Sequence, residues 1–579
     1  MNLLLENELN DVLCTIFKKL NLDEKFAFVK VSDRPDLSDF QCNGALALAK
    51  IAHKNPREIA ASIADELQKN KWVEAVSVDG PGFINIKLTN EFIAANVDKM
   101  AADKRLGCGE VPDKHKVVLD YGGPNVAKEM HVGHLRSGVI GESIRRIEKF
   151  VGNEVIADVH LGDWGTPMGM ILAEIIKTDG NLGKVETYDI AQITEFYKQA
   201  NIRCKEDETA KEAARKITAE LQGGNSEYRK AWQHLRGESL KAIKKNYEEL
   251  DVNFDLWLGE SDAHEACHEV VELARKNNIS EVDNGAEIIR LAESNKPKPP
   301  VIIVKSDGAF GYQLTDIATI KMRVDDLQAK EIVYLTDSRQ ALHFEQVFES
   351  VEKLEIAPNV KLQHIVFGTV NGADGKPFKT RDGGVMNLET LIEMSKDKVR
   401  QSLPKAGEVE GYGEKEIEKL TSQIAVAAIK FQDLKNTIVS GYVFELEDFA
   451  KFEGKTGPYI QYAVARINSV LRKAEANGLT FGKVVLQAPE ERVLALKLAQ
   501  IHNVIMRAHN EKEPSIIADY TYNLAQIFST FYNACSIMNA ESAELAASRL
   551  TLAKLVRDVL ILMLDLLGIE APEAMLKAE

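Results

Sequence analysis

The sequence predicts a multidomain α/β protein in which a parallel-sheet domain follows a small α+β module and precedes an all-α bundle. The chain has 579 residues, more than one hydrophobic core usually supports, so about two to four domains are expected. Between about residues 116 and 160, an apolar strand, a turn, a long helix and a second strand follow in the order of a βαβ unit. After about residue 394, every long segment has helical periodicity.

Residues 1–105 are predicted to form the α+β module. An amphipathic helix opens it, and a second helix is expected around residues 55–70. A strand is expected at residues 80–88, where a Gly/Pro turn precedes alternating apolar residues. Three acidic residues near the start stand where a secretory signal would be basic, so neither a signal nor a membrane span is expected.

Residues 106–393 are predicted to form the parallel-sheet domain, and residues 394–579 the helical bundle. The first two strands of the sheet are VVLDY and NEVIADVH. The charged, mainly helical stretch at about 180–299 is interpreted as an insertion. Strand patterns resume afterwards with PVIIVKS, EIVYLTD and LQHIVFGTV, so we expect the insertion to split the sheet.

Composition excludes several classes of protein. With 45% hydrophobic and 28% charged residues, the chain is neither disordered nor fibrous. Its six cysteines show no Cys-x-x-Cys pair, so we expect no structural metal or disulfide framework and a reducing, cytoplasmic location. A net charge of −16 argues against non-specific coating of nucleic acid, although a local basic face can still bind RNA.

A candidate phosphate-binding turn lies where the first strand of the sheet leads into its helix. His131 and His134 flank Gly133 there, and their spacing places both rings on one face. Free backbone N–H groups and the helix dipole favour phosphate, and Gly133 would let a nucleotide approach the backbone. Three further donors surround the pair: Asn125, Lys128 and Arg136. The alternative is a polar turn without a ligand.

A second candidate element is the glycine-bracketed loop at residues 372–384, which carries Lys376 and Lys379. Positioned cations can stabilise the charge on a leaving pyrophosphate without a protein nucleophile. A solvated surface hairpin is the alternative. A Walker A motif at 449–456 is incomplete because Phe449 replaces its first glycine, and no GxGxxG supports a dinucleotide cofactor.

These motifs resemble those of a known family. HVGH resembles the HIGH signature of class I aminoacyl-tRNA synthetases, and KPFKT resembles their KMSKS loop through its two lysines. The segments at 120–137, 160–166 and 567–573 resemble arginyl-tRNA synthetases, and the resemblance covers essentially the whole chain. It implies a Rossmann-like catalytic domain with a helical insertion, an N-terminal tRNA-binding module and a helical anticodon-binding domain.

The resemblance also implies a reaction. L-arginine and ATP would give arginyl-adenylate and pyrophosphate, and arginine would then pass to the 3′-terminal ribose of tRNA(Arg). It further implies Mg²⁺, a monomer and a need for tRNA in the activation step. The implied catalytic residues are His131, His134, Lys376, Lys379 and Lys128. The implied ATP-binding residues are His131, Gly133, His134, Lys376, Lys379, Val366 and Phe367.

The arginine-binding residues are implied in the same way. Asp120, Tyr312 and Asp316 would hold the guanidinium, which carboxylates match in geometry. Asn125, His134 and Gln340 would hold the amino-acid end. Tyr312 and Asp316 share one face if their segment is helical. Each has a plainer alternative, such as a strand-end cap for Asp120, a core aromatic for Tyr312 and a satisfied turn residue for Gln340.

Residues for the RNA partner are implied at both ends of the chain: Phe40, Gln41, Asn43, Tyr459, Gln461 and Arg466. Exposed aromatic side chains can stack on unpaired bases, and polar ones can bond to base edges. The alternative for Phe40 is a buried core position. Two other functions stay open from the residues alone, a small-molecule nucleotidyltransferase and a catalytically silent RNA-binding scaffold.

Overall fold

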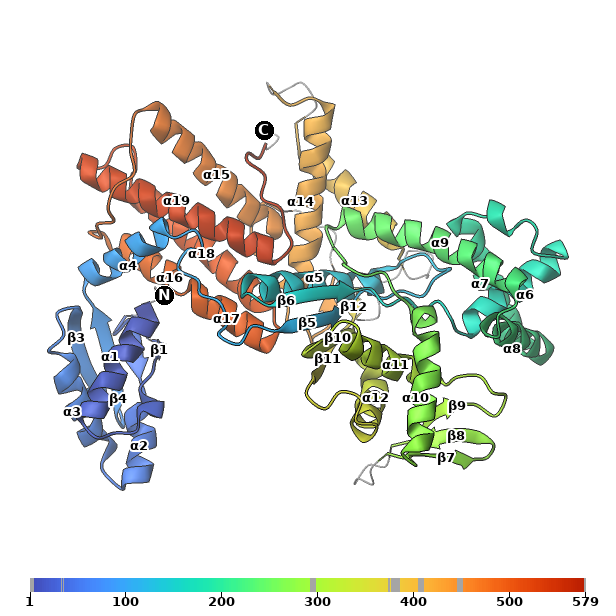
Figure 1. Cartoon of the computed structure of the whole chain (residues 1–579). Helices are drawn as coiled ribbons and strands as arrows, with labels where there is room; N and C mark the ends of the chain where they lie inside the picture. Colours follow the sequence, from blue (N-terminus) through green and yellow to red (C-terminus); the bar gives the residue numbers. More distant parts are fainter. Residues whose placement is uncertain are drawn as a thin grey trace.

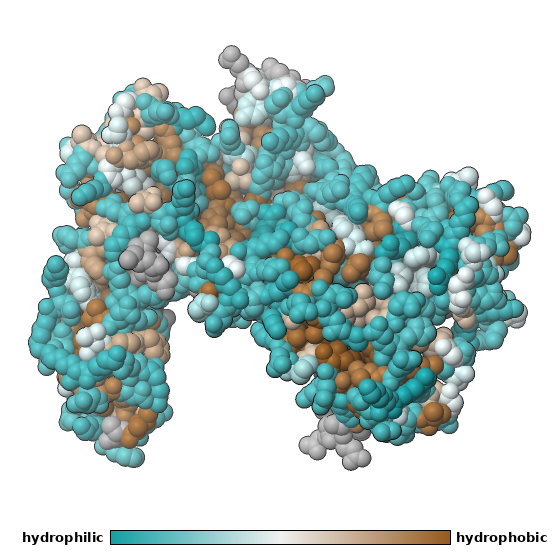
Figure 2. Space-filling model, in the orientation of Figure 1, coloured by the Kyte–Doolittle hydropathy of each residue, from teal (hydrophilic) through white to brown (hydrophobic). Residues whose placement is uncertain are grey.

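The computed structural model describes residues 5–576, except 33, 35, 292–297, 373–374, 376–385, 405–410 and 445–450. Three parts follow one another along the chain: an N-terminal module, a central domain built on a parallel sheet, and a C-terminal helical bundle (Figure 1). The N-terminal module and the central domain both extend from the bundle, and Figure 2 shows an open gap between them. No described helix is long and apolar enough to cross a membrane.

The N-terminal module is α+β, as predicted. Its antiparallel sheet has the order β1-β2-β4-β3, and β4 occupies the strand predicted after the Gly/Pro turn. The strands are β1 (Val29–Val31), β2 (Phe40–Cys42), β3 (Val73–Asp79) and β4 (Phe83–Leu88). The helices are α1 (Leu5–Lys19), α2 (Gly44–Ala52), α3 (Pro56–Leu67) and α4 (Asn90–Ala102), the last of which leads to the central domain.

The central sheet is parallel throughout, with the order β11-β10-β5-β6. Successive residues of its strands enter two different cores, since Val117 and Leu119 pack toward α5 and the bundle while Val118 packs toward α10 to α12. Helices therefore cover both faces, as a parallel sheet requires. The elements are β5 (Lys116–Asp120), α5 (Val132–Phe150), β6 (Glu154–Asp158), α11 (Tyr312–Asp325), β10 (Glu331–Asp337), α12 (Ala341–Lys353) and β11 (Lys361–Phe367).

The region between β6 and α11 is largely helical, as predicted, but its last strand was assigned to the wrong sheet. The strand β9 pairs antiparallel with β8 in a separate sheet of order β7-β8-β9. The elements are α6 (Thr166–Asp179), α7 (Ile190–Glu206), α8 (Glu208–Gln222), α9 (Ser226–Glu249), α10 (His264–Lys276), β7 (Ser280–Asp283), β8 (Ala286–Ile289) and β9 (Val301–Val304). Alternate residues of β9 are partly or fully exposed, whereas the first five residues of β10 are all buried, and this alternation suits the antiparallel partner of β9.

The C-terminal region is a helical bundle, as predicted, with one small exception. A two-residue strand, β13 (Tyr442–Val443), pairs with β12 (Val370–Asn371) and ties the bundle to the central domain. The helices are α13 (Leu388–Arg400), α14 (Glu414–Leu434), α15 (Gly457–Ala476), α16 (Pro489–Leu498), α17 (Ile501–Glu511), α18 (Ser515–Ala534) and α19 (Ala543–Leu566).

Helix α5 joins the central domain to the bundle along its length. Ser143 donates to the carbonyl of Leu566 at 2.8 Å, and the buried Glu148 carboxylate accepts from Lys512 at 2.7 Å. Arg136, near the start of the helix, is buried against Asp433 of α14 at 3.2 Å. The bundle therefore fixes the helix whose first turn carries the histidine pair.

Candidate active site

His131 and His134 cap the first turn of α5 for each other. His131 is the N-cap residue, and its Nδ1 accepts the backbone N–H of Gly133 at 3.0 Å. The Nδ1 of His134 accepts the backbone N–H of His131 at 3.1 Å. The two rings stack with their centres 3.9 Å apart. A Cβ at Gly133 would lie 2.7 Å from the His131 ring, so this glycine is needed to admit the ring.

The caps determine where each ring carries its proton. Burial lowers the pKa of His131, with a further contribution from Lys128. Burial also lowers the pKa of His134 to about 3, and His131 and Lys128 add to that shift. Both rings are therefore neutral near pH 7. Because each Nδ1 accepts a hydrogen bond, the proton must lie on Nε2, so both side chains present an Nε2–H donor.

Two of the cations near the pair have partners of their own. Arg136 donates to the carbonyls of Gly368 and Ser440 at 3.0 and 2.8 Å, besides its ion pair with Asp433. The prediction that Arg136 supplies a donor to the ligand is therefore wrong. Lys128 lies over the Tyr197 ring at 4.4 Å, and this contact with α7 leaves its ammonium near the histidines.

Lys376 and Lys379 lie outside the described residues, so their predicted role is untested. The chain that follows them is described, and it contacts the histidine turn directly. Val132 donates to the carbonyl of Met386 at 3.0 Å, and Leu388 donates to the carbonyl of Met130 at 2.9 Å. Met386 and Leu388 therefore lie beside the histidine turn.

An internal guanidinium occupies the carboxyl ends of β5 and β6. Nη2 of Arg323, from α11, donates to Asp120 and to Asp158, both at 2.7 Å. All three side chains are buried. Burial raises the pKa of Asp120, whereas the pKa of Asp158 is lowered because Arg323 and His160 outweigh its burial. One oxygen of Asp120 is therefore already used by the protein itself.

Tyr312 and Asp316 share one face of α11, as their spacing predicted. Oδ2 of Asp316 lies 2.6 Å from Nε2 of His343, and the Tyr312 ring stacks on the same imidazole with centres 5.1 Å apart. Tyr312 is 63% exposed. Hydrophobic residues also gather on the surface around α11 and α12 (Figure 2). The carboxylate and the aromatic ring thus lie together against His343 on one face of α11.

Glu260 is a carboxylate near Asp316 that sequence reasoning missed. Its Oε2 accepts the backbone N–H of Trp164 at 3.3 Å. Burial raises the pKa of Glu260 to about 7, and Asp316 and Asp163 add to the shift while His160 opposes it. No motif marks this glutamate, because it lies in the charged insertion about a hundred residues from the segment that it contacts.

The other predicted ligand residues surround the same edge of the sheet. Asn125 is exposed, and its segment pairs with Gly162, just beyond β6. Gln340 is exposed at the start of α12, at the end of the short 3-10 helix that follows β10. Val366 and Phe367 end β11. These residues therefore lie at the carboxyl ends of the four parallel strands, where open α/β sheets bind ligands.

Comparisons with known proteins agree along the whole chain. The family model for the class I (R) tRNA synthetase catalytic domain matches residues 96–446. The chain belongs to the arginyl-tRNA synthetase family. Models for the arginyl-tRNA synthetase N-terminal domain and the DALR anticodon-binding domain match residues 3–88 and 460–575. The family, the fold class and the ligase class predicted from the sequence are confirmed.

Named relatives of the family span nearly the same length. An arginine–tRNA ligase of Hyphomonas neptunium is 43% identical, covering 96% of this chain and 98% of that protein. One of Alkaliphilus oremlandii is 42% identical, covering 97% and 98%. A crystal structure of arginyl-tRNA synthetase from Plasmodium falciparum superposes with a TM-score of 0.80 at 26% identity, covering 98% and 99%.

Two residues that the family resemblance assigned to RNA are placed in cores. Phe40 is 3% exposed within β2, so it cannot stack on a base without unfolding the strand. Gln461 is fully buried, and its amide donates to the carbonyls of Gln423 and Glu570 at 3.2 and 2.7 Å. Both RNA assignments are wrong for this structure. Gln41 and Asn43 remain partly accessible beside Phe40.

Tyr459 and Arg466 instead line one cavity in the domain that matches the DALR model. The cavity has a volume of about 190 Å³ and also includes Tyr462, which is 40% exposed. Arg466 lies over the Tyr532 ring at 4.4 Å, which holds the guanidinium at the rim. An aromatic cavity with a cation is suited to an unstacked base.

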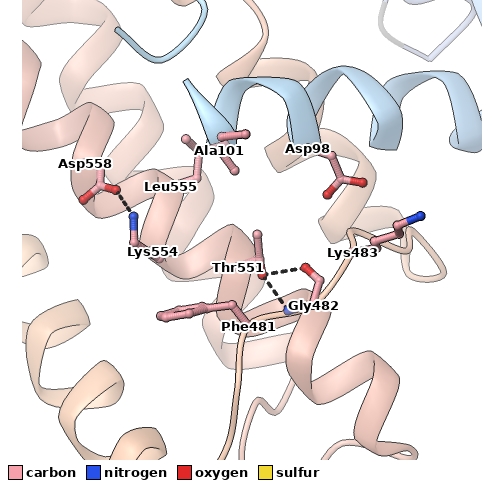
Figure 3. Close-up of a pocket in the computed structure, with 10 residues that line it drawn as sticks. Asp98, Ala101, Phe481, Gly482, Lys483, Thr551, Lys554, Leu555 and Asp558 are labelled. Carbon is pink, nitrogen blue, oxygen red and sulfur yellow. Dashed lines mark hydrogen bonds and ion pairs between the residues drawn. The ribbon is translucent and has the colours of Figure 1, made fainter. Parts of the chain in front are cut away.

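A larger cavity, of about 540 Å³, lies away from the sheet edge, where α4 meets α19 and the segment around Gly482. Figure 3 shows the contacts among the residues that line it. Lys554 pairs with Asp558 at 2.6 Å, and Thr551 exchanges hydrogen bonds with the backbone of Gly482. This cavity belongs to the junction between the N-terminal module and the bundle.

Proposed function

We propose that this chain joins L-arginine to ATP, forming arginyl-adenylate and releasing pyrophosphate, and then transfers arginine to the 3′-terminal ribose of tRNA(Arg). Membership of the arginyl-tRNA synthetase family implies the use of ATP. The observation that carries the proposal is that one edge of the sheet carries both two neutral histidine donors and a group of carboxylates. Donors suit an anionic phosphate and carboxylates suit a cationic side chain.

The acidic part of the edge is proposed to hold the guanidinium. Asp316, Glu260 and Tyr312 form this end, with Asp120 contributing the oxygen that Arg323 does not use. Carboxylates are the natural partners of a guanidinium fork. The ammonium and carboxylate of the substrate are proposed to bind at the same edge of the sheet, to Asn125, His134 and Gln340.

The histidine turn is proposed to act on the phosphates. The arginine carboxylate attacks the α-phosphorus and pyrophosphate leaves, so no protein nucleophile is needed. The Nε2–H groups of His131 and His134 would donate to phosphate oxygens as charge develops on them. Lys128, Lys376 and Lys379 would supply cations. The backbone bonds from Val132 to Met386 and from Leu388 to Met130, in the chain just after the last two lysines, support this assignment.

Magnesium is proposed to arrive with ATP. Within the described part of the chain, no three His, Cys, Asp or Glu side chains group as they would around a metal ion. The ion would therefore be held mainly by the ATP phosphates, which suits Mg²⁺. We also propose a cytoplasmic monomer.

The RNA is proposed to contact both ends of the chain. Tyr459, Tyr462 and Arg466 would bind a base of the anticodon loop, and Gln41 and Asn43 would contact the tRNA through the N-terminal module. Because α5 is packed into the bundle, binding of tRNA to the bundle can change the position of the first turn of that helix. This supports a need for tRNA in the activation step.

Aminoacylation of total tRNA by the purified protein, with each of the twenty amino acids in turn, tests the function. Arginine alone should be attached. Attachment of another amino acid, or of none, would refute the proposal. Pyrophosphate exchange measured with and without tRNA tests the activation step separately, and exchange at full rate without tRNA would contradict the proposed dependence.

A further inference from the structure

His160 is a polar side chain of the site that no role described so far uses. It follows β6 by two residues, and both of its ring nitrogens are shielded from water without a hydrogen-bond partner. A buried polar atom without a partner has lost its hydrogen bonds to water, and no hydrogen bond within the protein compensates for that loss. Such groups are rare in folded proteins and call for an explanation. A bound ligand that pairs with the ring would supply one.

The backbone of His160 is held in a conformation that L-residues rarely adopt. Its φ is +34°, in the left-handed region. The backbone on either side is fixed, since Leu161 donates to the carbonyl of Leu258 at 2.8 Å and His160 donates to Asp158 Oδ1 at 3.4 Å. A Cβ at Gly123 would lie 2.5 Å from the His160 carbonyl oxygen, so glycine is required opposite it. Strain of this kind persists where a function needs it.

The charges around His160 indicate which ligand it can meet. Asp120, Asp158 and Glu260 all interact electrostatically with His160, and the single positive charge of Arg323, which is shared between Asp120 and Asp158, cannot balance three carboxylates. Such surroundings repel phosphate and attract a cation. A neutral imidazole offers one acceptor nitrogen, which can receive an N–H of a cationic group without adding a positive charge.

We propose that His160 is a specificity-determining residue that accepts an N–H of the guanidinium of the arginine substrate. The inference rests on the arginine pocket proposed above. The substrate guanidinium would then be the hydrogen-bond partner that the His160 ring lacks in the free protein. It also accounts for the left-handed backbone, because an extended residue at this position would carry its side chain in a different direction.

The test replaces His160 by leucine, which fills similar space without nitrogen atoms. The KM for arginine in aminoacylation should rise about tenfold to a hundredfold, as expected for one hydrogen bond to a charged group. The KM for ATP should stay unchanged. His160→Asn should recover part of the loss, because an amide can accept an N–H and asparagine tolerates the left-handed region.

Stability separates this role from a merely structural one. His53→Leu is the matched control, because His53 is an exposed histidine with φ +48° at the end of α2. The Tm of His160→Leu, without substrates, should be at least that of His53→Leu, since leucine removes two unpartnered buried atoms. A lower Tm with equal increases in both KM values would show a structural role and overturn the proposal.

Asp316→Asn distinguishes failure of this inference from failure of the pocket. If Asp316→Asn raises the KM for arginine and His160→Leu does not, His160 has no part in binding and the pocket stands. If neither substitution changes that KM, the proposed pocket is itself wrong, and the role of His160 falls with it.

Discussion

At the scale of single residues, the most informative feature is the reciprocal cap between His131 and His134. The sequence placed both rings at a helix start, but it could not say which nitrogen of each ring faces the ligand. The caps use both Nδ1 atoms, so the free donors are Nε2–H. The same contacts show that Gly133 makes room for a protein ring, whereas the sequence suggested room for a nucleotide.

This arrangement predicts that two amide substitutions at His134 differ. In His134→Asn the short amide can keep the cap but cannot reach the ligand, so adenylate formation should fall about 10²–10³-fold. His134→Gln places its N–H₂ nearer to the position of Nε2 and should lose less. Single-turnover adenylate formation measures both. Equal losses, or a larger loss in His134→Gln, would contradict the tautomer assigned here.

Glu260 predicts a pH dependence of arginine binding. Its pKa of about 7 means that the carboxyl group is protonated in most molecules below pH 7 and ionised above it. A guanidinium binds the ionised form, so arginine must displace the proton at low pH. The KM for arginine should therefore rise toward tenfold per unit as pH falls below 7 and level off above it.

The measurement is the KM for arginine between pH 6 and 8, with the KM for ATP as internal control. Glu260→Gln should flatten the profile at a high KM, because the amide cannot ionise. A profile that keeps its slope in Glu260→Gln would assign the titration to another group.

At the scale of elements, the hydrophobic pattern of the sequence predicted whether a segment is a helix or a strand. It did not predict which strand would pair with which. The strand at 301–304 was correctly predicted as a strand, yet it joins β8 and not the parallel sheet. The sequence of a short apolar strand does not indicate which strand it will pair with. Only the packing of α10 and α11 brings β8 beside β9. Residues 312–325 are helical, so Tyr312 and Asp316 share one face as their four-residue spacing predicted for a helix, and both contact His343.

Helix α11 also predicts a stability effect at Arg323. In Arg323→Met, Asp120 and Asp158 are left buried without their cation, so the free energy of unfolding should fall by about 3–5 kcal/mol. Arg275→Met is the control, because the Arg275–Glu287 pair is largely exposed on the arginine side and should cost at most about 1 kcal/mol. Urea denaturation measures both. Similar values for the two would contradict the role of Arg323.

At the scale of the whole molecule, the bundle carries both other parts of the protein. It holds α5 through Glu148 and Ser143, and it holds the N-terminal module through Arg492, whose Nη2 lies 2.6 Å from Oδ2 of Asp39. This connection places the two predicted RNA-contacting ends on one frame around the gap in Figure 2.

Weakening the contact between the bundle and the N-terminal module should impair binding of tRNA more than binding of arginine or ATP. In Arg492→Met the N-terminal module loses bonds to Asp39, Asn90 and the carbonyl of Leu88, so the KM for tRNA should rise several-fold. The KM values for arginine and ATP should stay constant. Arg507→Met, which breaks an exposed pair with Glu511 on α17, is the matched control. A rise in all three KM values would argue against a separate docking role.

The sequence by itself determined the family, the order of α+β, parallel-sheet and helical parts, and the histidine turn at the start of α5. These depend on local periodicity and on motifs that are contiguous in the chain. Only the tertiary structure decided that Phe40 and Gln461 are core residues, that Arg323 pairs with Asp120, and that Glu260 lies near both His160 and Asp316. Burial and ion pairing arise between segments that are far apart in the chain, and no local pattern encodes which side chains will meet there.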